Sequence, residues 1–210
     1  MTSPMLISKV FPYATSRPLK DIMFDMETLG KRAGCPILTI GAVAFDPYAP
    51  YDGVIQSISR ENQFFARIDL STCKEAGLVA DPATEKWWQD QSPEAVAEAF
   101  GGTTPLRVAL EGFRDWLFEL CGKNPDEEAL CNVWSHGEDF DQPILNHAYE
   151  VLGMKKPWPY NGGRDTRTAL EMGSVRYKGT AHMAVQDAID QADAVRKAFA
   201  NLSLAQDLRT

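Results

Sequence analysis

The chain has 210 residues, 44% of them apolar and 10% aromatic, with a formal net charge of −8 at pH 7. This length and apolar content suffice for one domain with a substantial core. The acidic balance counts against a protein that coats DNA or RNA through a broad basic face, and it counts less against an enzyme whose acids surround metal ions.

Residues 1–20 contain three prolines and little periodicity, which predicts a leader ahead of a single domain over residues 21–205. This segment lacks the basic and apolar regions of a signal peptide, and no apolar run approaches the roughly 20 residues of a membrane span. The four cysteines are widely spaced, which is typical of buried thiols in a reducing compartment. We therefore expect a cytoplasmic protein without a membrane partner.

The first predicted strand carries two carboxylates. Apolar residues 22–24 indicate a buried strand, and Asp25 and Glu27 follow it. Because residues i and i+2 of a strand point to the same face, both acids look the same way. Two carboxylates that close repel each other unless a cation or a proton lies between them, and Mg²⁺ or Mn²⁺ suits such oxygen ligands. An isolated Asp-x-Glu also fits a strand that simply ends in a turn.

A second strand is predicted over residues 36–45, which are apolar on both faces. A third strand covers either residues 55–59 or residues 63–68. The short turns between these runs indicate an antiparallel meander at the start of the domain.

The pattern becomes helical over residues 71–120. Ser92-Pro93 predicts a helix start with serine as N-cap, and Thr104-Pro105 repeats this pattern. Apolar residues then recur at helical spacing from residue 106 to residue 120. Trp87 and Trp88 are adjacent, so one is expected in the core and the other at a seam, or as a surface on which a base stacks.

Residues 129–134 predict another buried strand, followed by a helix from residue 140 to about residue 152. A short helix begins near Asp165, a candidate N-cap, and the last helix covers about residues 181–202 with one apolar stripe. Basic residues that are candidates for phosphate contacts are Lys31, Arg32, Arg164, Arg167, Arg176 and Lys178. His136 and His147 are interpreted as structural.

Two further groups of polar residues accompany these elements. Asp141 lies at the start of a predicted helix, and His182 precedes Asp187 by five positions at the last helix. Phosphoryl transfer with two metal ions needs such a set of acids, which hold the ions about 4 Å apart. A histidine of near-neutral pKa is able to take the proton from the attacking water. Taken singly, Asp141 also fits an acid at a helix N-terminus, and His182 a capping or surface histidine.

Together these residues resemble the three motifs of the DEDD exonuclease superfamily, in its DEDDh branch. The motifs are Phe24-Asp25-Met26-Glu27-Thr28, Phe140-Asp141, and His182 with Asp187. The chain is most similar to the subgroup of phage DexA-type exodeoxyribonucleases and Rv2179c-like 3′–5′ exoribonucleases. The segments similar to this subgroup are residues 25–30, 84–91, 134–137, 140–145 and 164–168.

The resemblance implies an α/β, RNase H-like fold, a mixed β-sheet flanked by helices. It implies 3′–5′ hydrolysis of nucleic acid with two Mg²⁺ or Mn²⁺ ions. The residues it assigns as metal ligands are Asp25, Glu27, Asp141 and Asp187, with His182 as general base. Thr28 and Leu29 would meet the terminal nucleotide, with Leu29 wedged against its base, and Trp88 and Arg164 are further candidate contacts.

One departure from the motif is the acidic pair Glu138 and Asp139 beside Asp141. Asp139 competes with Asp141 as the ligand, and we select Asp141 because Phe140 precedes it as the motif requires.

The resulting hypothesis is a 3′–5′ exonuclease acting on single-stranded nucleic acid, with DNA slightly favoured by the phage-type resemblance. A 3′–5′ exoribonuclease of the same mechanism is the first alternative. A catalytically inactive nucleic-acid-binding protein on the same fold and a small-phosphoester phosphatase are the others. Related nucleases are often dimers, so a homodimer is a further expectation.

Overall fold

A computed structural model describes residues 19–51, 58–137, 139–179 and 182–202 of the chain. The predicted leader therefore lies outside the described residues except for Leu19 and Lys20, as do residues 203–205 of the predicted domain. The alternative third strand at 55–59 falls largely in an undescribed segment as well. Among the described residues, no helix is both long and apolar enough to cross a membrane.

The described strands form one mixed five-stranded sheet in the order β3-β2-β1-β4-β5. β1 runs antiparallel to β2 and parallel to β4, and β4 runs parallel to β5. Their bounds are Asp21–Thr28 (β1), Ile37–Phe45 (β2), Gln63–Arg67 (β3), Asn132–Ser135 (β4) and Gly163–Asp165 (β5). The predicted meander of the first three strands is confirmed, and the third strand is the one at 63–68.

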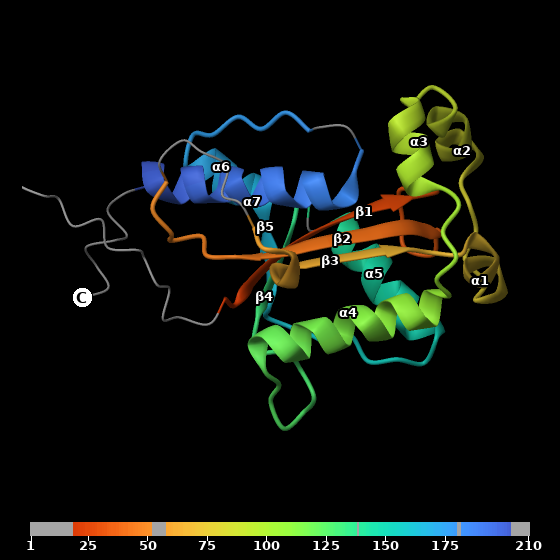
Figure 1. Cartoon of the computed structure of the whole chain (residues 1–210), viewed down its shortest axis with the longest axis horizontal. Helices are drawn as coiled ribbons and strands as arrows, with labels where there is room; N and C mark the ends of the chain where they lie inside the picture. The colour runs from red at the N-terminus through yellow and green to blue at the C-terminus, as the bar shows by residue number, and fades with distance from the viewer. Residues whose placement is uncertain (1–18, 52–57, 138, 180–181, 203–210) are drawn as a thin grey trace, which may run out of the picture.

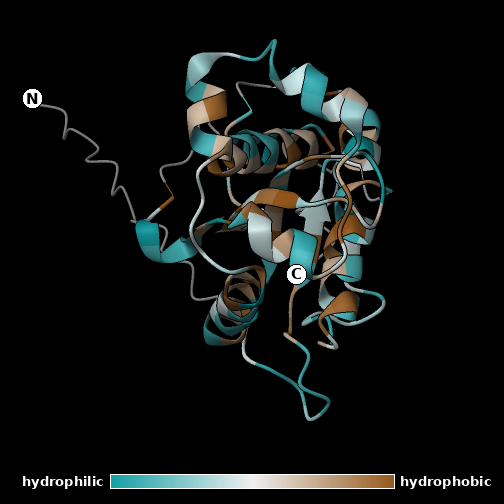
Figure 2. Cartoon of the chain, turned by 90° about the vertical axis from the view of Figure 1, so that its right-hand side faces the viewer, coloured by the Kyte–Doolittle hydropathy of each residue, from teal (hydrophilic) through white to brown (hydrophobic). Residues whose placement is uncertain are grey.

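Seven α-helices are described, together with a 3-10 turn at Arg60–Asn62. The helix bounds are Leu70–Glu75 (α1), Pro82–Trp88 (α2), Pro93–Ala99 (α3), Leu106–Cys121 (α4), Asp141–Val151 (α5), Thr166–Met172 (α6) and Ala184–Asn201 (α7). α4 lies against one face of the sheet and α7 against the other, while α2 and α3 stand at one end (Figure 1). Hydrophilic and hydrophobic segments alternate along the helices in Figure 2, as expected for helices that cover a sheet.

The alternation of side chains along β1 divides the core between the two faces of the sheet. Ile22 and Phe24 point into the larger cluster, under α4 and α5, with Phe113 at its centre. Met23 points into the smaller cluster under α7. The face that carries Met23 continues along the strand to Asp25 and Glu27, so β1 passes from an apolar core directly into a pair of carboxylates beneath α7.

Three local features differ from what the sequence predicted. Thr104 does not cap α4, because the Leu106 N–H donates to Thr72 Oγ1 of α1 at 2.9 Å. The last helix begins at Ala184 rather than 181, and β5 (Gly163–Asp165) was not predicted at all. The Ser92 cap is confirmed, since its Oγ accepts the Ala95 N–H at 3.1 Å.

Candidate metal centre and nucleotide cavity

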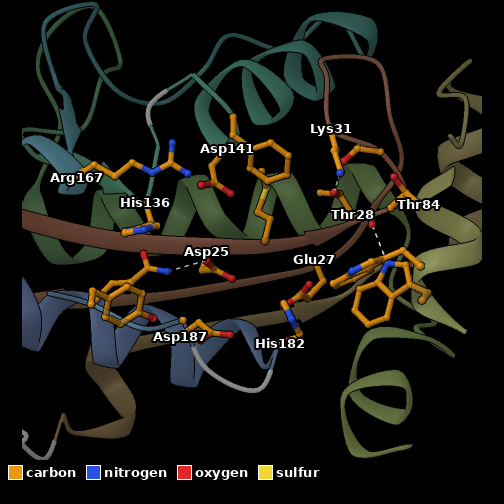
Figure 3. Close-up of a pocket in the computed structure, with 18 residues that line it drawn as sticks. Asp25, Glu27, Thr28, Lys31, Thr84, His136, Asp141, Arg167, His182 and Asp187 are labelled. Atoms are coloured by element: carbon orange, nitrogen blue, oxygen red, sulfur yellow. Dashed lines mark hydrogen bonds and ion pairs between the residues drawn. The ribbon is translucent and has the colours of Figure 1, made fainter. Parts of the chain in front are cut away.

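A cavity of about 440 Å³ lies at the carboxyl ends of the parallel strands β1, β4 and β5. Ligand sites of α/β sheets form at such ends, and small-molecule sites occupy roughly 300–1,000 Å³. The polar and aromatic residues along its wall include Asp25, Glu27, Thr28, Lys31, Thr84, Trp87, His136, Asp141, Arg167, Tyr177, His182, Asp187 and Gln191. Asp187 and His182 lie on one side, and Asp141, His136 and Arg167 on the other (Figure 3).

Three carboxylates of this cavity form a compact group. Asp25, Glu27 and Asp187 each offer an oxygen, and these oxygens lie within 4.8 Å of one another. The first two follow from the two-residue period of β1, and Asp187 comes from the first turn of α7. Its Oδ2 also accepts the backbone N–H of Met183 at 3.0 Å, which orients the carboxylate at the start of the helix.

The pKa values of two of these acids are raised, because the carboxylates are buried close together without a neutralising positive charge among the described residues. Burial, followed by repulsion from Asp187, raises the pKa of Asp25 to about 7. Burial, followed by repulsion from Asp25 and Asp187, raises the pKa of Glu27 to about 9. Such a group holds protons in the absence of a cation and is suited to exchange them for a divalent ion with oxygen ligands.

Asp141 lies across the cavity from Asp187 (Figure 3) and is 3% exposed. It begins α5 and does not belong to the group of three oxygens within 4.8 Å. Burial and repulsion from Asp25 and Glu27 raise its pKa well above the ordinary range, while Arg167 acts in the opposite direction. Its competitor Asp139 is exposed, with Oδ1 3.9 Å from Arg167 Nη1, so Asp141 is the acid that faces the cavity. Glu138 lies outside the described residues.

His182 stands at the mouth of the cavity, two residues before α7. Its Nδ1 lies 4.0 Å from Glu27 Oε1, and its side chain is 43% exposed. The ring also packs edge-to-face against Trp87, with centroids 4.9 Å apart. The histidine and the acids that the sequence places far apart are therefore brought together at one site.

Gln191 is a site residue that the sequence reasoning missed. Its Nε2 donates to Asp25 Oδ1 at 2.9 Å, and its Oε1 is buried with no partner in the described structure. The available signal was its spacing, because Gln191 follows Asp187 by four residues and shares its face of α7. Thr84, His136 and Tyr177, none of which was assigned to the site, line the cavity too.

Residues 20–199 match the family described as the 3′-5′ exoribonuclease Rv2179c-like domain. The chain belongs to this family. No curated protein matches the sequence.

Several solved structures share the fold at low sequence identity. Cell-death related nuclease 4 (CRN-4) is 14% identical with a TM-score of 0.50, over 87% of this chain and 64% of that one. The zinc-bound E. coli ExoI–ssDNA complex is 10% identical with a TM-score of 0.55, over 92% of this chain and 42% of that one. Product-bound exonuclease I is 9% identical with a TM-score of 0.55, over 91% and 45%. The chain thus spans less than two thirds of each of these proteins, and the predicted RNase H-like mixed sheet is confirmed.

Two of the predicted nucleotide contacts are buried. Leu29 is 2% exposed and packs with Leu38 and Ala95, so it has no free surface to wedge against a base. Trp88 is 3% exposed, and its Nε1 donates to the Thr28 carbonyl at 3.0 Å. Both tryptophans line the cavity, and Trp87, at 39% exposure, is the more accessible of the two.

The predicted contact at Arg164 also lies away from this cavity. Its guanidinium donates to the carbonyls of Asn161 and Gly163, and it borders a different hollow, next to Lys20 and Phe45. Arg167, at the start of α6, lines the cavity instead. Thr28 remains at the wall of the cavity, where its Oγ1 donates to the Gly30 carbonyl at 2.7 Å.

Proposed function

We propose that the protein removes nucleotides one at a time from the 3′ end of single-stranded RNA by metal-dependent hydrolysis. The observation that carries this proposal is the convergence of Asp25, Glu27 and Asp187 on one point beside Asp141 and His182, in a chain of an exoribonuclease-like family. The Rv2179c-like family description supports RNA over the DNA that the phage-type resemblance favoured.

The donor set fits divalent cations. Four carboxylates line a single cavity, and three of them offer oxygens within 4.8 Å of one another. Asp25, Glu27 and Asp187 would hold one Mg²⁺ or Mn²⁺, and Asp141 together with Asp25 would hold a second. Such ions, when bound, supply positive charge that stabilises the attacking and leaving oxygens of a phosphodiester.

The proton steps are assigned to His182. A water positioned beside the acids attacks the phosphorus of the terminal nucleotide and gives one proton to the imidazole. The bond from phosphorus to the 3′-oxygen of the preceding nucleotide breaks, that oxygen takes a proton from solvent water, and the imidazolium returns its proton to solvent. The products are a nucleoside 5′-monophosphate and a chain one residue shorter, with a new 3′-hydroxyl.

The cavity also offers positive charge for a polyanionic substrate despite the chain's net charge of −8. Lys31 lines the cavity from the loop after β1, and Arg167 lines it from the start of α6. Gly137 lets Arg167 come close, because a Cβ there would lie 3.0 Å from the guanidinium carbon. We assign the side chains of Lys31 and Arg167 to contacts with the phosphates of the substrate.

The test uses 5′-labelled single-stranded RNA and DNA of one sequence, each incubated with Mg²⁺, Mn²⁺ or EDTA. Asp25→Asn and His182→Ala run beside the unchanged protein, with exposed Tyr160→Ala as the control. We expect a ladder that shortens RNA from its 3′ end and vanishes with EDTA, Asp25→Asn and His182→Ala. Faster shortening of DNA than of RNA would show that the preferred substrate is DNA. Binding without shortening would indicate an inactive relative, and cleavage of phosphomonoesters alone a phosphatase.

A further inference from the structure

The segment that carries His182 is contacted by α2 and α3, which stand at the end of the sheet beside the start of α7 (Figure 1). Trp87 of α2 packs against the imidazole with centroids 4.9 Å apart and an interplanar angle of 87°. Trp88 approaches the same ring at 6.4 Å and 70°. We refer to Trp87 and Trp88 as the tryptophan pair.

The tryptophan pair is anchored to the strand that bears the acids. Trp88 is almost fully buried, and its Nε1 donates to the carbonyl of Thr28, the residue after Glu27, at 3.0 Å. The ring of Phe100 packs perpendicular to the Trp88 ring, with centroids 5.4 Å apart. The ring of Trp87 packs against the Trp88 ring with centroids 5.2 Å apart and an interplanar angle of 78°. Aromatic pairs of this geometry are favourable beyond their burial, so Trp87 is held in a defined position relative to β1.

A second contact fixes the other side of the histidine segment. The Glu98 carboxylate of α3 lies near the backbone N–H of Ala184, the first residue of α7, and this N–H lowers the pKa of Glu98 against the larger effect of burial, which raises it. An acid at this end of a helix satisfies a free N–H and complements the helix dipole. His182 is therefore bracketed by the Trp87 ring on its side chain and by Glu98 two residues further along its backbone.

The backbone conformation of His182 is itself unfavourable, so contacts from neighbouring residues are needed to hold the segment in place. Its φ of +57° lies in the left-handed region, which a histidine adopts at a cost. Its side chain is 43% exposed, and Nδ1 lies 4.0 Å from Glu27, longer than a hydrogen bond. Among the described residues, the polar neighbour of this imidazole is Glu27, at a long distance, so the tryptophan rings are its main orienting contacts.

We propose that Trp87 is a positioning residue that holds the His182 imidazole toward the attacking water. This inference rests on the proposed function of His182. The alternative role of Trp87 is to stack against a nucleobase of the substrate, and this role predicts a different kinetic effect.

Steady-state kinetics on the oligonucleotide that the ladder assay selects separate the two uses. Trp87→Leu removes the ring, Trp87→Phe keeps an aromatic face, and Trp116→Leu on α4 is the control for loss of a half-buried indole remote from the cavity. We expect Trp87→Leu to lower kcat about tenfold at constant KM, part of the 10²–10⁴ that a general base contributes. Trp87→Phe should restore most of kcat, and Trp116→Leu should leave both constants unchanged. A rise in KM with constant kcat would overturn the proposal in favour of base stacking.

An NMR measurement tests the contact between the Trp87 and His182 rings independently of catalytic activity. The chain has three histidines, so the spectrum of His182→Ala assigns the His182 ring signals by subtraction. Trp87→Leu should shift these signals and leave those of His136 and His147 in place, with an unchanged Tm. Unshifted signals would overturn the proposal. If His182→Ala abolishes cleavage while Trp87→Leu is fully active, only the positioning role fails; if His182→Ala is fully active, the proposed base fails as well.

Discussion

The side-chain amide of Gln191 donates to Oδ1 of Asp25 at 2.9 Å, from α7 across to β1. This bond fixes the rotation of a carboxylate whose oxygens face Glu27 and Asp187. Groups that orient a metal ligand through such a hydrogen bond typically change metal affinity 10–100-fold when they are removed. The Gln191–Asp25 bond therefore ties the helix that supplies one acid to the strand that supplies two.

Replacing Gln191 should weaken metal binding. We expect Gln191→Leu to raise the Kd for Mn²⁺ by about tenfold or more, since Asp25 then loses its orientation. Gln186→Leu is the matched control, because Gln186 is exposed on the same helix and donates to Asp190 at 2.8 Å. Calorimetric titration of both variants measures the difference. Equal affinities in the two variants would show that Gln191 does not support the site.

The metal-free protein should lose stability as the pH rises. The pKa values of Asp25 and Glu27 are raised to about 7 and about 9 in the folded state, whereas an unfolded carboxyl titrates near ~4. Between those values the folded state binds more protons than the unfolded state, so the free energy of unfolding falls as the pH rises from about 4 to 9.

Thermal melts in EDTA at pH 5 and pH 8 measure this effect. We expect a lower Tm at pH 8, a smaller difference in Asp25→Asn, and a larger gain from Mg²⁺ at pH 8 than at pH 5, because the ion replaces the protons. A pH dependence that Asp25→Asn leaves unchanged would contradict the assignment of these shifts to the acid group.

The two acids beside the start of α5 should differ sharply in function. Asp141 is buried at the cavity, whereas the side chain of Asp139 is 89% exposed. We expect Asp141→Asn to lower kcat by about 100-fold or more, as loss of a group that stabilises transition-state charge does. Asp139→Asn should stay within about threefold of the unchanged protein, since exposed pairs contribute little. Comparable losses in both variants would return Asp139 to the list of ligands.

Gly41 allows the start of α7 to approach the sheet beneath the acids. It pairs with Asp25 in the β1–β2 ladder, and a Cβ there would lie 2.3 Å from the Ala184 carbonyl carbon. We expect Gly41→Ala to lower the free energy of unfolding by about 1–3 kcal/mol and to weaken Mn²⁺ binding, because it displaces the helix that carries Asp187.

Gly112→Ala is the matched control within α4. A Cβ at Gly112 would lie 3.7 Å from Phe64, an ordinary contact. Alanine in a helix interior gains up to about 1 kcal/mol over glycine, so this variant should keep or raise stability in urea unfolding. A stable Gly41→Ala protein with normal Mn²⁺ binding would show that the close approach is not required.

Local periodicity accounts for the parts of the site that the sequence predicted. The alternation along β1 places Asp25 and Glu27 on one face, and the helical stripe on α7 places its apolar side on the sheet. These features depend on neighbours within a few residues. The closeness of Asp187 to Asp25 came instead from the resemblance to known motifs, because no local pattern joins β1 to α7.

The failures concern features that depend on packing between distant segments. β5 has only three residues, Gly163–Asp165, and forms because β4 lies beside it. The cap of α4 comes from Thr72, which precedes the helix by 34 positions. Which tryptophan of the pair is buried depends on the Thr28 carbonyl that Trp88 reaches. None of these partners is visible in the residues adjacent to the feature.

If the acids of this cavity are a divalent-metal centre for nucleotide hydrolysis, Mn²⁺ should bind among them. Anomalous diffraction from crystals soaked with Mn²⁺ and a nucleoside 5′-monophosphate locates the ions. We expect two manganese peaks, one contacting Asp25, Glu27 and Asp187 and one contacting Asp25 and Asp141, with the phosphate beside both. A cavity without manganese at millimolar concentration, or with the nucleotide bound away from these acids, would contradict the proposed metal centre.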